Sequence, residues 1–249
     1  MLTEERWGAI LELVEREKAV SVPELEKRLG VSASTIRRDL TQLNSLGKLI
    51  KVHGGATSIG TQYVGKDLTM DEKYLMNSDE KMDIARYAAE LISPGDYVYI
   101  DAGTTTEMLV DCIREQNATY ITNSLTNARK LVRKGFKTFL TGGEVKGTTE
   151  AVVGAEAAEY LRKLHFTIGF WGTNGVSAED GFTTPDQNEA MMKRISMGQT
   201  TKRYILCDRS KFSVVSPVTF ADFEDAVVIT GKLTDKKYKK YENIMEVTK

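Results

Sequence analysis

The sequence predicts an α/β protein of two unequal domains: an N-terminal helical domain that ends in a β-hairpin, and a larger, doubly wound domain built on a mostly parallel sheet. Apolar residues at helical spacing run through residues 3–51, which is enough chain for three short helices. From residue 78 onward, helical segments alternate with short β-branched and aromatic runs, as in parallel sheets covered by helices. We place the domains at residues 1–58 and 78–249, with a linker at 59–77.

Composition excludes several classes of protein. A chain of 249 residues that is 41% hydrophobic can bury a substantial core, so it is not a disordered tail. Its apolar runs fall short of the ~20 residues that cross a bilayer, and its start lacks the basic region of a secretion signal. We therefore expect a cytoplasmic protein with no membrane contact.

Two cysteines, Cys112 and Cys207, and two histidines without metal-ligand spacing predict neither a metal nor a disulfide framework, and we expect no cofactor.

The first two helices follow from apolar spacing and capping residues. Trp7, Ile10 and Val14 recur at spacings of three and four, so they lie on one face of a helix. Ser21 can cap a second helix, and Gly30 supplies the conformational freedom that ends it.

The third helix and the segment after it complete a recognisable pattern. Ser32 can cap a helix over residues 33–46, and Gly47 suits the left-handed residue that closes such a helix. Residues 48–53 are β-prone and are cut off by two glycines, which predicts a hairpin. Three helices and a hairpin in this space predict a winged helix-turn-helix. The apolar face of the third helix consists of Ile36, Leu40 and Leu43.

Basic and hydroxylic side chains gather on the third helix and the hairpin. The net charge of the whole chain is only -1, but residues 32–58 contain four basic residues and only one acidic residue. This local excess of positive charge attracts a polyanion. Hydroxyls at a helix N-terminus suit phosphate oxygens, and arginine pairs with guanine. The alternative is an ordinary solvated helix face. The candidate DNA-binding residues are Ser32, Ser34, Thr35, Arg37, Arg38, Lys48, Lys51 and His53.

Two residues near this surface also have a structural interpretation. Asp39 directly follows Arg37 and Arg38, and we expect it to form a local ion pair that orients one of them rather than to contact a base. His53 either touches phosphate from the hairpin or terminates a strand.

Three spaced motifs run through the first domain. They are Arg6-x-x-x-Ile10-x-x-x-Val14, Ser32-x-x-Thr35-Ile36-Arg37-Arg38-Asp39-Leu40 and His53-Gly54-Gly55-Ala56. Together they resemble the DeoR family of bacterial sugar-metabolism regulators over the whole domain. The resemblance implies binding to double-stranded operator DNA, with the third helix as the recognition helix.

The clearest chemical feature of the second domain follows its first predicted strand, residues 97–100. Asp101-Ala102-Gly103-Thr104-Thr105-Thr106 leads directly into a helical segment. Glycine permits close backbone approach, and the amides and hydroxyls of the three threonines can hold a phosphate. The same residues also suit an ordinary turn and helix cap, so both interpretations stay open.

Small and hydroxylic residues follow other predicted strands. Asn123 and Ser124 come after residues 119–122, and Gly143 and Glu144 come after residues 138–140. Parallel strands end at one edge of the sheet, so these residues are expected at one rim, where they suit a polar small molecule. Each alone also fits a plain strand-to-helix turn. The rim includes Gly-Thr-Asn-Gly at 172–175, and the further predicted strands are 166–170, 204–206 and 226–229.

A loop at residues 181–188 runs into a helix that carries Glu189 and Lys193 on one face. By themselves these two form a surface ion pair. With the motifs above, Gly181-Phe-Thr-Thr-Pro-Asp186 and Glu189-Ala-x-x-Lys193 resemble the DeoR-type sensor over residues 78–249, a domain similar in fold to ribose-5-phosphate isomerase and CoA transferases. The resemblance implies a sugar-phosphate site whose candidate residues are Asp101, Gly103, Thr104, Thr105, Thr106, Asn123, Ser124, Gly143, Glu144, Asp186, Glu189 and Lys193.

Within that family, the motifs at 101–106, 172–176 and 181–186 resemble most those of the fructose-operon repressors, which implies fructose 1-phosphate as the effector. Gln187 and Asn188 depart from that branch, where Pro and Asp are more frequent at these positions.

Two rival functions remain. One is a sugar-phosphate isomerase-like enzyme fused to a helix-turn-helix, since Asp101, Asp186, Glu189 and Lys193 include groups that can move protons. The other is a module that serves assembly alone. The attached DNA-reading domain favours binding over turnover, so we expect a regulator and not an enzyme. One recognition helix per chain predicts a homo-oligomer, a dimer or tetramer.

Overall fold

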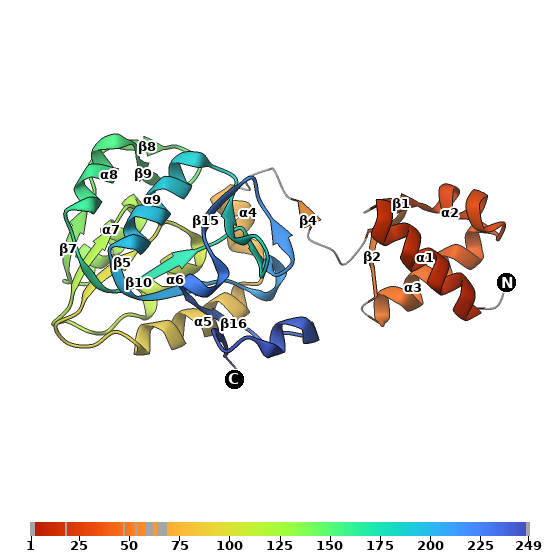
Figure 1. Cartoon of the computed structure of the whole chain (residues 1–249). Helices are drawn as coiled ribbons and strands as arrows, with labels where there is room; N and C mark the ends of the chain where they lie inside the picture. Colours follow the sequence, from red (N-terminus) through yellow and green to blue (C-terminus); the bar gives the residue numbers. More distant parts are fainter. Residues whose placement is uncertain are drawn as a thin grey trace. The chain divides into compact units, whose positions relative to one another are not determined.

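The computed structural model describes residues 3–17, 19–46, 48–52, 54–57, 62–63 and 69–247. The chain divides into two compact units, Met1–Gln62 and Tyr63–Lys249, which are drawn in Figure 1. The boundary falls inside the linker that the sequence predicts at 59–77, and the short strand β4 (Gln62–Tyr63) lies at it.

The first unit is a three-helix bundle with a small antiparallel sheet in the order β1-β3-β2. This arrangement confirms the predicted winged helix-turn-helix. Strand β1, which the sequence analysis did not predict, adds a third strand to the hairpin. The core combines Ile10 of the first helix, Leu25 of the second and Leu40 of the third. The elements are α1 (Thr3–Glu17), β1 (Ala19–Ser21), α2 (Val22–Leu29), α3 (Ala33–Ser45), β2 (Ile50–Val52) and β3 (Gly55–Thr57).

Local capping sets the bounds of α2 and α3 as predicted. The Ser21 hydroxyl accepts a hydrogen bond from the Glu24 amide at 3.3 Å, and Gly30 has a left-handed φ of 65°. Ser32 accepts from the Thr35 amide at 3.4 Å. The predicted helix-closing Gly47 and the candidate His53 lie outside the described residues.

Asp39 does not pair with its neighbouring arginines, and that expectation is wrong. Its carboxylate accepts hydrogen bonds from Arg6 Nε at 2.5 Å, Arg6 Nη2 at 3.1 Å and Trp7 Nε1 at 2.9 Å. Asp39 lies on the buried side of α3, whereas side chains one and two positions away project elsewhere on a helix. Burial favours a higher pKa, but the bonds from Arg6 and Trp7 outweigh it and lower the pKa of Asp39. The pair therefore fastens α1 to α3.

Replacing Asp39 by alanine should lower the free energy of unfolding of the first unit by about 1–3 kcal/mol, because the part-buried donors of Arg6 and Trp7 lose their acceptor. The pKa of Asp39 is below its ordinary value of 3.8, so this contribution is complete above that pH and is lost as the pH falls through the lowered pKa. Hydrogen exchange of α1 and α3 in urea measures it. Arg38→Ala, an exposed neighbour, is the control; equal protection in Asp39→Ala and wild type would refute the role.

The second unit is built on a seven-stranded sheet in the order β17-β16-β13-β10-β5-β6-β7. All six neighbouring pairs run parallel, which confirms the predicted α/β class. The six predicted strands are present, and the last strand was not predicted. The strands are β5 (Tyr97–Ile100), β6 (Thr119–Thr122), β7 (Lys137–Leu140), β10 (Phe166–Gly172), β13 (Thr200–Leu206), β16 (Val227–Thr230) and β17 (Ile244–Glu246).

Helices bury both faces of this sheet, as Figure 1 shows. Along β5, Val98 and Ile100 join one apolar cluster, whereas Tyr99 between them joins the other, because successive strand residues point to opposite faces. The cluster around Val98 includes side chains of α5 (Ser78–Glu90), α6 (Thr104–Cys112) and α7 (Leu125–Arg133). The cluster around Tyr99 includes side chains of α8 (Ala155–Arg162) and α9 (Gln187–Gly198).

Short elements surround the sheet. One of them, α4 (Met70–Leu75), lies within the segment that the sequence analysis treated as a linker. Thr69 and Glu72 form a capping box at its start, so the Thr-x-x-Glu pattern was the signal that predicts this helix. The others are β8 (Glu144–Lys146), β9 (Ala151–Val153), β11 (Gly175–Ser177), β12 (Gly181–Thr184), η1 (Arg209–Lys211), β14 (Val214–Val215), β15 (Val218–Ala221), η2 (Phe223–Asp225) and η3 (Lys236–Lys240).

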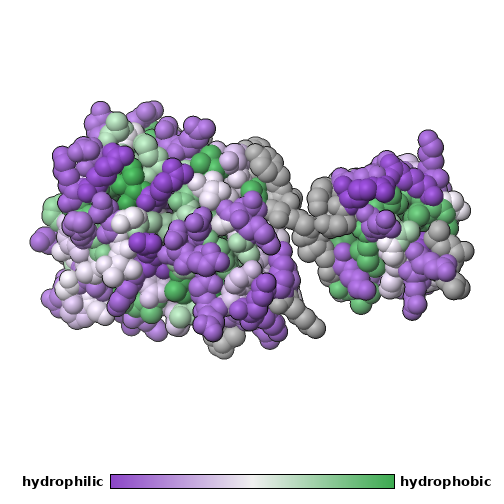
Figure 2. Space-filling model, viewed as in Figure 1, coloured by the Kyte–Doolittle hydropathy of each residue, from purple (hydrophilic) through white to green (hydrophobic). Residues whose placement is uncertain are grey.

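The visible surface of both units is mostly hydrophilic, with apolar residues in separate small areas (Figure 2). Among the residues that the structure describes, no helix combines the length and apolar character needed to cross a membrane.

Candidate functional site

The chain reverses its direction across the sheet between β5 and β10. From β5 it continues to β6 and β7 on one side, and it then returns to β10 and proceeds to β13, β16 and β17 on the other. The loops that leave the carboxyl ends of β5 and β10 therefore lead to opposite sides of the sheet. This place, where the strand order changes direction, is the topological switch point, and open α/β sheets bind their ligands there.

Side-chain hydrogen bonds hold the loop after β5 in place. Thr106 Oγ1 donates to the Asp101 carbonyl at 2.7 Å and to the Gly103 carbonyl at 2.9 Å, and Asn127 Nδ2 donates to the same Asp101 carbonyl at 3.1 Å. The first main-chain bond of α6 runs from the Glu107 amide to the Gly103 carbonyl. The three preceding threonine amides are thus free of intrahelical partners, and with the helix dipole they suit an anion.

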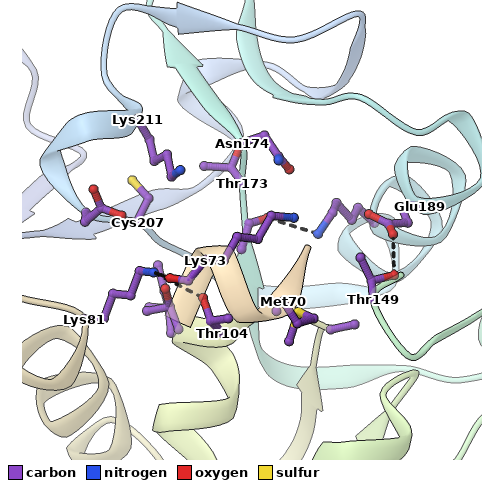
Figure 3. Close-up of a pocket in the computed structure, with 17 residues that line it drawn as sticks. Met70, Lys73, Lys81, Thr104, Thr149, Thr173, Asn174, Glu189, Cys207 and Lys211 are labelled. Carbon is purple, nitrogen blue, oxygen red and sulfur yellow. Dashed lines mark hydrogen bonds between the residues drawn. The ribbon is translucent and has the colours of Figure 1, made fainter. Parts of the chain in front are cut away.

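A pocket opens at this switch point, and Figure 3 shows lysines from different elements around it. Among the described residues, four lysines and two acids line it, which gives this lining a net charge of +2. It therefore favours an anionic ligand. The lining residues are Met70, Lys73, Lys81, Ala102, Gly103, Thr104, Thr105, Thr149, Gly172, Thr173, Asn174, Glu189, Lys193, Leu206, Cys207, Asp208 and Lys211.

Lys193 reaches the pocket from α9 and forms an ion pair with Asp101. Both side chains are nearly fully buried. The ammonium also donates to the Gly172 carbonyl at 3.1 Å, and the Gly172 amide donates to Asp101 at 3.1 Å. Burial raises the pKa of Asp101, and the Lys193 ammonium opposes that rise. The pair ties the ends of β5 and β10 to α9.

Glu189 also reaches the pocket from α9. Its carboxylate accepts hydrogen bonds from Lys146 Nζ at 2.9 Å and Thr149 Oγ1 at 2.8 Å. Asp186 caps α9 by accepting from the Glu189 amide at 2.9 Å, and it also pairs with Lys146 at 3.2 Å. The bonds to Glu189 and Asp186 outweigh desolvation and raise the pKa of Lys146.

The structure gathers some of the predicted ligand residues and separates others. Gly103, Thr104, Thr105, Glu189 and Lys193 line the pocket, and Asp101 forms the ion pair with Lys193. Seven predicted residues are not in the lining, and Asp101 is one of them. Thr106 bonds the carbonyls of its own loop, and Asp186 caps α9 and pairs with Lys146. The other four lie elsewhere. The Asn123 side chain forms hydrogen bonds with the Tyr99 hydroxyl and the Val152 carbonyl, and Ser124 caps α7. A Cβ atom on Gly143 would lie 2.6 Å from the Val153 carbonyl oxygen. Glu144 is exposed on β8.

Several lining residues were missed by the sequence analysis. Lys73 on α4, Lys81 on α5 and Lys211 on η1 come from segments outside the rim motifs. A signal for Lys81 was present, because it shares the buried face of α5 with Ile84, Ala85 and Ala88, and a lysine on an apolar helix face requires a partner.

The N-terminal end of α3 presents the second candidate surface, in the first unit. The Ser32 hydroxyl lies 3.0 Å from the hydroxyls of both Ser34 and Thr35. Arg37 and Arg38 are exposed, and neither makes an ion pair within the described part of the chain. Lys48 and Lys51 are exposed too, and Lys51 Nζ donates to Thr41 Oγ1 at 2.8 Å, which links the hairpin to α3.

The titratable side chains do not assemble a metal site in the described ranges. No group of three or more His, Cys, Asp or Glu side chains there is arranged to hold a metal ion.

Two family models match the chain. One describes a DeoR-like helix-turn-helix domain and covers residues 6–62, and the other describes the DeoR C terminal sensor domain and covers residues 76–232.

Curated relatives match over nearly the full length. FruR of Bacillus subtilis, described as an uncharacterized HTH-type transcriptional regulator, is 38% identical over 100% of this chain and 97% of its own. The lactose phosphotransferase system repressor of Streptococcus mutans is 36% identical over 94% of this chain and 93% of its own. Among solved structures, ribose 5-phosphate isomerase of Methanocaldococcus jannaschii aligns with a TM-score of 0.41 at 17% identity, covering 55% of each chain. The two matched domains and the full-length relatives show that the chain belongs to the DeoR family of DNA-binding transcriptional regulators.

Proposed function

We propose that this protein represses a sugar-utilisation operon in the cytoplasm and that a phosphorylated sugar bound in the pocket controls its affinity for DNA. The observation that carries the proposal is the β5–α6 loop. Its residues Gly103, Thr104 and Thr105 line a pocket with a net charge of +2, and the Thr104 and Thr105 amides have no intrahelical partner. A phosphate monoester carries about -1.5 to -2 at neutral pH, so it balances that charge. The amides and the Thr104 and Thr105 hydroxyls supply hydrogen bonds to its oxygens.

Fructose 1-phosphate is the effector we propose. The motifs that follow β5 and β10 and precede α9 resemble those of fructose-operon repressors, and the first two of them contribute Gly103 and Asn174 to the pocket. Amide and carboxylate groups such as those of Asn174 and Glu189 can bond sugar hydroxyls. One relative is a lactose phosphotransferase system repressor, so other sugar phosphates belong in the same test.

We propose that Ser32, Ser34, Thr35, Arg37, Arg38, Lys48, Lys51 and His53 contact the operator, and that a homo-oligomer presents two such surfaces to repeated half-sites. An effector that favours the DNA-incompetent arrangement weakens operator binding by a factor that is typically about 5 to 150, and bound DNA weakens effector binding equally.

Thermal unfolding of the wild-type chain with a panel of sugar phosphates tests the proposal. Fructose 1-phosphate should raise the midpoint more than fructose 6-phosphate, ribose 5-phosphate or unphosphorylated fructose, because a ligand at 100 times its dissociation constant adds about 2.7 kcal/mol of stability. NMR of the ester should show it unchanged after incubation, since the proposal is binding without turnover. A panel in which no phosphate ester shifts the midpoint would contradict it.

A further inference from the structure

Lys81 is a buried lysine that forms no ion pair with any described carboxylate. Its side chain is 3% exposed, and within the described ranges no carboxylate lies within ion-pair distance of it. Lys193, which is also buried, forms an ion pair with Asp101. Burial lowers the pKa of Lys81, because desolvation disfavours its charged form. The carboxylate of Asp208 in the same pocket lining opposes this effect, and an anion bound beside Lys81 favours the charged form in the same way.

The ammonium of Lys81 joins two different elements. It donates to Thr104 Oγ1 at 3.3 Å, at the start of α6, and to the main-chain carbonyl of Lys73 on α4. Figure 3 shows both bonds at the edge of the pocket. An ammonium has three donors, so one remains for an anion bound beside Thr104.

Helix α4 forms a wall of the same pocket through Met70 and Lys73. It has only six residues, and a capping box holds its start. The Lys73 carbonyl near its other end accepts from Lys81 and, at 3.3 Å, from the Met76 amide. A helix this short has little stability of its own, so its position depends on such contacts.

We propose that α4 is an effector-dependent clamp and that Lys81 is the positioning residue that closes it. A bound phosphate supplies the counter-ion of Lys81, and the charged ammonium then holds the phosphate and the Lys73 carbonyl together. Occupancy of the pocket fixes α4, the first helix after the boundary between the two units. This inference rests on the proposed phosphate site and adds how the protein responds when a phosphate binds there.

Hydrogen exchange of the full-length protein, with and without saturating fructose 1-phosphate or inorganic phosphate, tests the clamp. In the wild type, either ligand should slow exchange of the amides at residues 70–76 several-fold. Lys81→Met should bind each ligand roughly tenfold or more weakly, because it lacks a charged hydrogen bond, and at saturation its α4 should gain no protection. Methionine suits the buried site, so the variant should fold.

Lys211→Met is the matched control. It also removes one pocket lysine, but from η1, and within the described ranges no hydrogen bond or ion pair joins that side chain to α4. It should weaken binding and yet retain the full protection of α4 at saturation. Wild-type binding without protection of α4, or equal protection in Lys81→Met, overturns the clamp alone. Failure of every phosphate probe to bind the wild type overturns the clamp and the proposed function together.

Discussion

Replacing Lys193 by methionine should destabilise the second unit by about 3–5 kcal/mol, because removing one member of a buried ion pair leaves the other charge uncompensated. Asp101 is 2% exposed and has Lys193 as its ion-pair partner. Burial already raises the pKa of Asp101, and loss of the ammonium raises it further. The loss of stability should therefore be greatest above this raised pKa and shrink as the pH falls through it. Urea denaturation of the full chain at several pH values measures the effect.

The double variant Asp101→Asn with Lys193→Met separates structure from ligand binding. It removes both charges, so most of the lost stability should return, whereas sugar-phosphate binding should stay weak because Lys193 is absent. If the double variant were as unstable as Lys193→Met, the ion pair would not be the cause. If it bound fructose 1-phosphate as the wild type does, Lys193 would have no part in the site.

Replacing Arg37 by alanine should weaken operator binding by about 1–3 kcal/mol, the usual contribution of an arginine that reads a base. Arg37 is exposed near the start of α3, and no ion pair within the described residues holds it. Effector binding should be unchanged, because the pocket belongs to the other unit.

Fluorescence anisotropy with the promoter fragment that the wild-type protein protects from nuclease measures this change. Arg133→Ala, which removes an exposed arginine from α7 of the second unit, is the control and should bind as the wild type does. Operator affinity equal to the wild type would remove Arg37 from the DNA-binding surface.

Features that depend on neighbouring residues in the chain could be predicted from the sequence. Ser21, Gly30 and Ser32 bound their helices as expected, since capping acts within one turn. The strands at 97–100 and 119–122 match β5 and β6 residue for residue. Both are buried β-rich runs between helices, which is the pattern of a parallel sheet.

Features that depend on contacts between distant segments could not be predicted. Asp39 pairs with a residue 33 positions away rather than with its neighbours, because helix geometry decides which side chains can meet. Lys73 and Lys81 were missed because they lie on α4 and α5, which precede the first strand of the sheet in the chain, although both side chains line the pocket at the edge of that sheet. Gly143 follows a strand as a ligand glycine would, but close backbone packing against β9 already explains why glycine occupies that position.

The most direct measurement is a crystal structure of the full chain with fructose 1-phosphate. The account predicts the phosphate at the amides of Thr104 and Thr105, within hydrogen-bond distance of Lys81. A sugar ester bound away from the β5–α6 loop, or a pocket that stays empty at saturating ligand, would contradict it.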